Sequence, residues 1–145
     1  MNLTVVLPAD MTAPARARAL VAECVDSSSV RRVALQQDAM QVVSELTANA
    51  VLHGEPPYKL QVSAQPDSVR IEISQNQGRR PGSGPKIRAD RLGLQLVAAL
   101  SQGWGSTTAP GDAHGQVVRQ TVWAQIDNST SSGTSPTRLG SPSQG

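Results

Sequence analysis

The spacing of the apolar residues changes at residues 54–57, and this change limits the chain to folds that contain both helices and strands. Before it, residues 30–52 carry apolar side chains every three or four positions, which is the spacing of an amphipathic helix. After it, residues 58–64 and 69–74 alternate apolar and polar side chains, as half-buried strands do. Turn residues at 65–68 separate these two runs, so we predict an antiparallel hairpin.

Shorter patterns predict the remaining elements. We expect an edge strand at 3–7, helices at 14–25 and 90–101, and strands at 104–108 and 117–126. Strands therefore come in adjacent pairs, without the regular strand-helix alternation of a doubly wound fold. This order predicts an α+β fold: a two-layer sandwich with a mostly antiparallel mixed sheet and about three helices on one face.

The composition allows one folded domain and a tail. The chain has 145 residues, of which 38% are hydrophobic and 2% aromatic, with no Phe, so Leu, Val, Ile, Ala and Met must form the core. Residues 128–145 are rich in Ser, Gly and Pro. Such a segment buries too little apolar surface to offset the entropy lost on ordering. We therefore expect a folded domain at 1–127 and a disordered tail at 128–145.

The cysteine content and hydropathy predict a cytoplasmic protein. Cys24 is the only cysteine, so an internal disulfide cannot form. No stretch approaches the 18 or so consecutive apolar residues of a membrane span, and the first residues lack the basic start of a signal peptide. We expect no association with a membrane.

A basic stretch at residues 79–91 stands out against a net charge of only +2. It contains one acidic residue, Asp90, and the basic residues Arg79, Arg80, Lys86, Arg88 and Arg91. Such a stretch attracts phosphate groups or an acidic protein surface, and it is equally compatible with a solvated loop. A nucleic-acid partner is disfavoured, because the stretch contains no aromatic residue on which bases could stack.

Three polar residues follow one another at intervals of four on the predicted helix at 30–52. Glu45, Asn49 and His53 are offset by only about 40° per step, so all three share one side of the helix. A carboxylate next to a carboxamide oxygen suits Mg²⁺, which prefers hard oxygen ligands. The alternative is structural: a surface acid, a polar residue that bonds locally and a cation at the helix end.

Residues 44–54 read Ser-Glu-Leu-Thr-Ala-Asn-Ala-Val-Leu-His-Gly. This run resembles the N box of the GHKL ATPases, which have the Bergerat or histidine-kinase-like fold, and in particular that of the small bacterial anti-sigma-factor serine kinases. Weaker resemblances follow in the family's order at 7–10, 69–74, 93–97, 103–105 and 121–123. Together they cover about 3–127.

The resemblance implies that the chain binds ATP and Mg²⁺. Glu45 would be the general base or water-orienting carboxylate, Asn49 the Mg²⁺ ligand, and 77–90 the lid over the nucleotide. The further nucleotide contacts would be His53, Gln75, Arg79, Arg80, Lys86, Gly93, Leu94 and Thr121. An active member would be a serine/threonine protein kinase that regulates transcription, with a sigma factor or an anti-sigma-factor antagonist as its partner; a homodimer is compatible with this role.

Three positions depart from the family pattern. Gln75 stands where the family has the Asp that accepts from the adenine amino group, although an amide can also accept there while its NH₂ donates to a ring nitrogen. Arg91 replaces a glycine of the phosphate loop, and Gln120 stands where Lys is common. These departures favour an alternative: a degenerate, non-catalytic protein-interaction module that binds nucleotide weakly or not at all. A nucleic-acid binder that uses the basic stretch is a third, weaker hypothesis.

Overall fold

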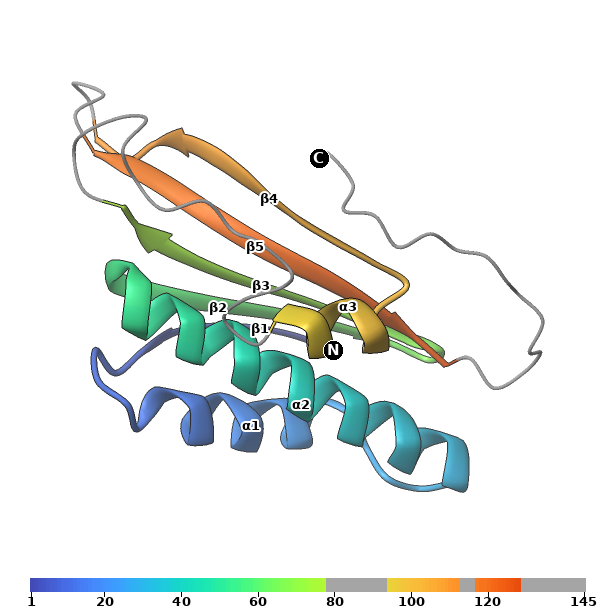
Figure 1. Cartoon of the computed structure of the whole chain (residues 1–145). Helices are drawn as coiled ribbons and strands as arrows, with labels where there is room; N and C mark the ends of the chain where they lie inside the picture. Colours follow the sequence, from blue (N-terminus) through green and yellow to red (C-terminus); the bar gives the residue numbers. More distant parts are fainter. Residues whose placement is uncertain (78–93, 113–116, 129–145) are drawn as a thin grey trace.

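The computed structural model describes residues 1–77, 94–112 and 117–128, which form an α+β fold with helices and strands as labelled in Figure 1. In chain order the elements are β1 (Asn2–Leu7), α1 (Ala13–Cys24), α2 (Val30–His53), β2 (Glu55–Gln65), β3 (Ser68–Asn76), α3 (Leu94–Leu100), β4 (Gly103–Pro110) and β5 (Val118–Asp127). The expected hairpin is confirmed, because β2 pairs with β3 in antiparallel register.

The strands form one five-stranded sheet in the order β1-β2-β3-β5-β4. All four pairings between these strands are antiparallel, so the expectation of a mixed sheet is corrected. Figure 1 shows the three helices on one face of this sheet, which gives the expected two-layer arrangement. The described elements end with β5; residues 129–145, most of the expected tail, lie outside the described residues.

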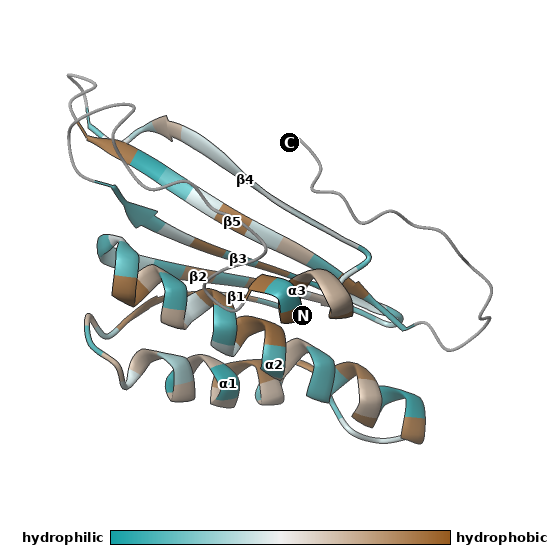
Figure 2. Ribbon diagram, in the orientation of Figure 1, coloured by the Kyte–Doolittle hydropathy of each residue, from teal (hydrophilic) through white to brown (hydrophobic). Residues whose placement is uncertain are grey.

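The core lies between the sheet and the helices and contains almost only aliphatic side chains. Polar and apolar residues alternate along β2, β3 and β5, so one face of each of these strands supplies the core (Figure 2). The sheet contributes Leu60, Val62, Val69, Ile71, Ile73, Ala124 and Ile126, and α2 contributes Leu35, Ala39, Val42, Val43, Leu46 and Ala50. Branched aliphatic side chains thus form most of the core of this chain, which has no Phe.

Helix α2 begins at the predicted residue and ends one residue after the predicted end. Ser29 caps its start by accepting a hydrogen bond from the backbone N–H of Arg32 at 3.2 Å. Gly54 follows its last residue in an extended conformation. The observed helix, Val30–His53, is one residue longer than predicted. Helix α3 covers Leu94–Leu100 of the predicted 90–101, and residues 90–93 lie outside the described residues.

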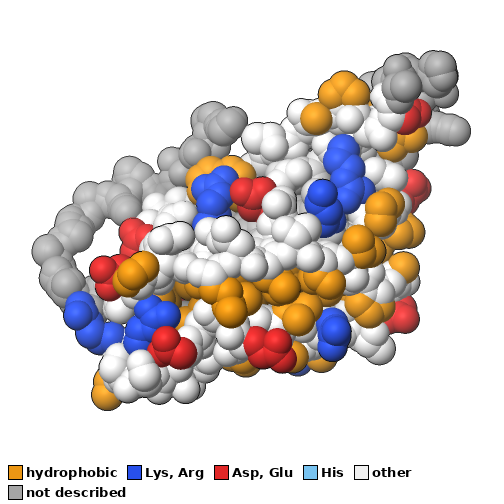
Figure 3. Space-filling view, turned by 180° about the vertical axis from the view of Figure 1, so that it is seen from behind, with side chains coloured by type: hydrophobic (Ala, Val, Ile, Leu, Met, Phe, Trp, Pro, Cys, Tyr) orange, Lys and Arg blue, Asp and Glu red, His pale blue; other side chains and the backbone are white. Residues whose placement is uncertain are grey.

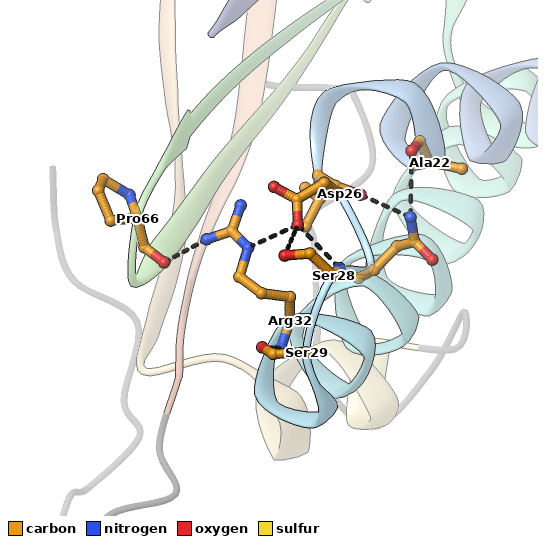
Figure 4. Close-up of polar contacts among 8 residues, drawn as sticks. Ala22, Asp26, Ser28, Ser29, Arg32 and Pro66 are labelled. Carbon is orange, nitrogen blue, oxygen red and sulfur yellow. Dashed lines mark hydrogen bonds and ion pairs between the residues drawn. The ribbon is translucent and has the colours of Figure 1, made fainter.

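A group of polar contacts joins the start of α2 to the β2–β3 turn of the sheet (Figure 4). Asp26 accepts hydrogen bonds from the backbone N–H of Ser28 at 3.0 Å, from the Ser28 hydroxyl at 2.7 Å and from Arg32 Nε at 3.3 Å. These donors, the Ser28 backbone foremost, hold the pKa of Asp26 below its usual value. Arg32 also donates to the carbonyl oxygen of Pro66 in the β2–β3 turn. The Arg32 side chain therefore links the segment between α1 and α2 to the β2–β3 turn.

The second face of the sheet carries no helix among the described elements and is polar. Arg70 forms an ion pair with Glu72 at 2.9 Å and lies 4.4 Å from the ring centroid of Trp123. Figure 3, the view from behind Figure 1, shows scattered Lys, Arg, Asp and Glu side chains and a band of hydrophobic side chains that runs across this side of the molecule. Within the described ranges, no helix combines the length and the hydropathy that crossing a membrane requires.

Candidate functional site

Helix α2 holds Glu45 and Asn49 at the border between its core face and its surface. Both side chains are half-buried, and their neighbours Leu46 and Ala50 are buried in the core. His53, the last residue of the helix, is exposed. The structure therefore keeps the acid and the amide together at the edge of the core, whereas His53 lies in solvent.

Asn49 carries a buried donor without a partner. Its Nδ2 atom is inaccessible to solvent and has no hydrogen-bond partner within the described part of the chain, and the same holds for the hydroxyl of the fully buried Thr47. A buried donor left without an acceptor costs about 1–3 kcal/mol. A site one turn from Glu45 thus has a donor that an oxygen atom of water or of a ligand would satisfy.

Gln75 lies at the end of β3 and faces the helices. Its side chain is only 5% exposed, and its Nε2 donates to Oε1 of Gln120 on β5 at 3.1 Å. Gln77 donates to the same oxygen at 3.0 Å. A Cβ atom placed on Gly54 would overlap the Gln75 carboxamide, so this amide packs directly on the glycine that ends α2. We call Gln75, Gln77 and Gln120 the glutamine cluster.

Gln120 and Gly54 belong to the candidate site in ways that sequence reasoning missed. The sequence marked Gln120 only as a lost phosphate contact, but the β3–β5 register makes it the direct cross-strand partner of Gln75. The alternation of β5 indicates that residues 120, 122 and 124 share a face. It does not indicate which strand pairs with β5, so this partnership required the structure.

Tyr58, on β2, contacts Gly54, the residue that follows the last residue of α2. Its hydroxyl donates to the carbonyl oxygen of Gly54 at 3.2 Å. Burial raises the pKa of the Tyr58 phenol, and the charge of Glu55 raises it further. The phenol therefore keeps its proton and remains a donor at neutral pH.

Two predicted contact residues lie elsewhere. Thr121 pairs with Ser74, and strand alternation places both on the polar face of the sheet, opposite to Gln75. The structure therefore does not bring Thr121 to the predicted site, and Gln120 takes the inward position. The side chain of Leu94 is 1% exposed and packs in the core, so it offers no surface to a ligand.

The predicted lid cannot be placed against these residues. Arg79, Arg80, Lys86 and Gly93 lie outside the described residues, as does Arg91. Of the predicted lid at 77–90, only Gln77 is described, and it belongs to the glutamine cluster.

The oxygen donors of the site fit Mg²⁺ only in company with other ligands. Among the described residues, no group of three or more His, Cys, Asp or Glu side chains lies together as a metal site would require. Glu45 and Asn49 offer one carboxylate and one carboxamide. That is the small protein share that suits an Mg²⁺ ion whose other ligands are water and phosphate oxygens.

Comparisons with known proteins add no assignment to this geometry. No protein-family model matches the chain. No curated protein matches its sequence either.

Proposed function

We propose that the chain is an ATP·Mg²⁺-binding regulatory protein of the Bergerat-fold type that acts on a protein partner. By its resemblance to anti-sigma-factor serine kinases, the partner would be a sigma factor or an anti-sigma-factor antagonist, and the process would be transcription. The α+β layers, with α2 over the sheet, are compatible with that fold. In this proposal the nucleotide lies between α2 and the ends of β3 and β5.

The observation that carries the proposal is the pair formed by Glu45 and Asn49. They lie one turn apart on α2, both half-buried, and Asn49 has a buried donor with no partner within the described ranges. A helix that served only to cover the sheet would gain nothing from an amide donor left unsatisfied at its core edge. A water shell or a phosphate oxygen at this position would supply the missing acceptor.

Each residue has a distinct role in this proposal. Bound Mg²⁺ would neutralise charge on the phosphates, and Asn49 would hold it through its side-chain oxygen. Glu45 would orient the hydroxyl group of a protein substrate or a water molecule. Gln75 would accept a hydrogen bond from the base. In a kinase these roles add up mainly to positioning and charge neutralisation.

Calorimetric titration of the full chain with ATP, with and without MgCl₂, tests the proposal. We expect binding that depends on Mg²⁺, and we expect Asn49→Ala to remove that dependence and to weaken binding by about tenfold, equivalent to about 1.4 kcal/mol. Asn49→Asp keeps an oxygen ligand and should retain the dependence.

Gln41→Ala is the matched control, because Gln41 is exposed on the same helix. It should bind ATP like the unchanged chain. Absence of heat and of any thermal shift at millimolar ATP would contradict the proposal. So would a Mg²⁺ dependence that survives in Asn49→Ala.

The second candidate is the non-catalytic interaction module, and one observation favours it. The Gln75 carboxamide, at the position of the family's base-reading acid, is packed on Gly54 and bonded to Gln120. A chain that uses its own side chains to fill this position would keep the fold without the ligand. A folded protein that gives no nucleotide heat would support this candidate.

A further inference from the structure

Strand β1 lies at one edge of the sheet, and among the described strands it pairs with β2 alone. The amino group of Met1 donates to the carbonyl oxygen of Ala64 at 2.9 Å, and the N–H group of Ala64 donates back to the carbonyl oxygen of Met1 at 2.8 Å. Bonded and non-bonded pairs alternate along an antiparallel ladder, so the odd-numbered residues of β1 bond to β2. The backbone N–H and C=O groups of the even-numbered residues therefore point away from β2; these residues are Asn2, Thr4 and Val6.

The β1 edge lacks the features that usually keep an edge strand apart from other strands. Its sequence, Asn-Leu-Thr-Val-Val-Leu, contains no charged residue and no proline, and it pairs with β2 without a register shift. The other edge strand, β4, contains Gly103 and Gly105 and ends at Pro110, and glycine and proline weaken strand pairing. Of the two edges, β1 is thus the one that is better suited to accept a further strand.

Apolar side chains border the β1 edge on the helix side of the sheet. Leu3 and Val5 of β1, and Leu20 and Cys24 of α1, pack against the core but are only partly buried. Helix α1 contacts β1 and β2 and lies below β1 in Figure 1. A partner that covered this border would bury these four side chains further and stabilise the complex through their apolar surface.

Helix α1 carries a charge pattern that is complementary to itself. Arg16, Leu20 and Glu23 lie within about 60° of one another around the helix axis. They lie on the flank away from Arg18, which donates to the hydroxyl of Ser44 on α2 at 2.7 Å. Arg16 and Glu23 are exposed, and neither forms an ion pair with another described residue. A two-fold axis near Leu20 would place Arg16 of each copy against Glu23 of the other.

We propose that two copies of this chain pair through β1 and form one continuous sheet that joins the five strands of each copy. The two-fold axis would pass between the two Thr4 residues, and Asn2 of each copy would pair with Val6 of the other. These three pairs would exchange about six backbone hydrogen bonds. On the helix side, Leu3 of each copy would face Val5 of the other. The interface is isologous, because both copies use the same surface.

The two layers of this interface fit the same axis. The strand residues from Leu7 back to Thr4 span about 10 Å, and so do the helical residues from Ala13 to Leu20. Leu7 and Ala13 are the facing ends of β1 and α1, so Leu20 lies near the level of Thr4. The axis that pairs the two strands therefore also pairs the charges of the two α1 helices. None of these residues belongs to the proposed nucleotide site, so the dimer does not depend on it.

Sedimentation equilibrium of the full chain over a range of concentrations tests the proposal. We expect a particle with twice the mass of one chain. Thr4→Pro removes an N–H group that points away from β2, so the fold should persist while the central pair is lost, and this variant should be a monomer. Thr4→Val keeps the N–H group and is the matched control, which should dimerise like the unchanged chain.

Charge reversals on α1 test the interface without changing the strand. Arg16→Glu and Glu23→Arg each place like charges against each other, so each should weaken dimerisation by about tenfold. The double variant Arg16→Glu/Glu23→Arg exchanges the two charges and should restore it. Arg31→Glu, at an exposed position of α2, is the control for net charge and should leave dimerisation unchanged.

The outcomes separate this proposal from the nucleotide site. A chain that stays monomeric at every concentration overturns the dimer, and the β1 edge would then be open to a strand of another protein. A dimer that persists in a folded Thr4→Pro variant overturns it too, as does a double charge variant that is no tighter than the single ones. If Thr4→Pro does not fold, the charge variants decide. Dimerisation without ATP binding would contradict only the proposed function.

Discussion

The side chain of Gln36 provides the hydrogen-bond donor for carbonyl groups at the end of α1. The last carbonyl groups of a helix have no partner within that helix. Gln36, from α2, donates its Nε2 atom to the carbonyl oxygen of Ala22 at 3.1 Å and to that of Val25 at 2.5 Å (Figure 4 shows the acceptor at Ala22). One amide group therefore satisfies two carbonyls and joins the two helices.

We expect Gln36→Met to lower the free energy of unfolding by about 1–3 kcal/mol, because both carbonyls lose their donor while the apolar stem is kept. Chemical denaturation measures the change. Gln37→Met is the control, because Gln37 is exposed on the same helix and should change stability little. Equal losses in the two variants would assign the effect to helix propensity and not to the two carbonyls.

At the scale of the element, the second and third residues of β2 cannot donate to a sheet. Pro56 and Pro57 have no backbone N–H, and the β2–β3 register is irregular between Glu55 and Lys59. Side chains from β3 and β5 instead donate hydrogen bonds to the carbonyl oxygens of these two prolines. Asn76 donates to the carbonyl oxygen of Pro56 at 3.2 Å, and Arg119 donates to that of Pro57 at 2.8 Å. This start of β2 depends on its neighbours' side chains.

We expect Arg119→Leu to loosen the start of β2. Arg119 also donates to Asn76 at 3.0 Å and to Ser74 at 2.9 Å, so its loss removes a whole group of bonds. Amide hydrogen exchange should become faster at 58–59 and stay slow at 60–64.

The control is Arg70→Leu, which removes a cation from the same face of the sheet but no bond to β2. Its exchange at 58–59 should stay unchanged. Uniformly faster exchange along β2 in Arg119→Leu would mean that Arg119 stabilises the whole sheet and not its irregular end.

For the molecule as a whole, the described part of the core lies between the helices and the sheet (Figure 1). The described core ends with Ile126, and Asn128 donates its backbone N–H to the carbonyl oxygen of Asp67 at 2.8 Å. This bond joins the end of β5 to the β2–β3 turn. The described part of the chain is therefore hydrogen-bonded to the sheet up to Asn128.

We expect a chain that ends at Asn128 to unfold at the same temperature as the full chain, within about 2 °C, since about 1 kcal/mol shifts the melting temperature by 2–8 °C. Scanning calorimetry of both chains provides the comparison. A clearly lower melting temperature of the shorter chain would show that the tail contributes to the folded domain.

The sequence predicted the features of the fold that depend on residues close to one another along the chain. Apolar spacing, and its change at 54–57, placed α2 to within one residue, because both signals are local. Long-range pairing decided the rest. Gln75 and Gln120 are 45 residues apart, and no local pattern indicates that they meet. Thr121 was predicted from the resemblance alone, although the alternation along β5, a local pattern, places it on the face opposite to Val122 and Ala124.

The glutamine cluster contains three polar groups and no formal charge. Ionic strength screens charges but leaves the direction of a buried dipole unchanged. In the proposed site, recognition by these amides would depend on hydrogen-bond geometry and little on salt. A salt dependence of binding would then come from the charged groups of the ligand and of other parts of the chain.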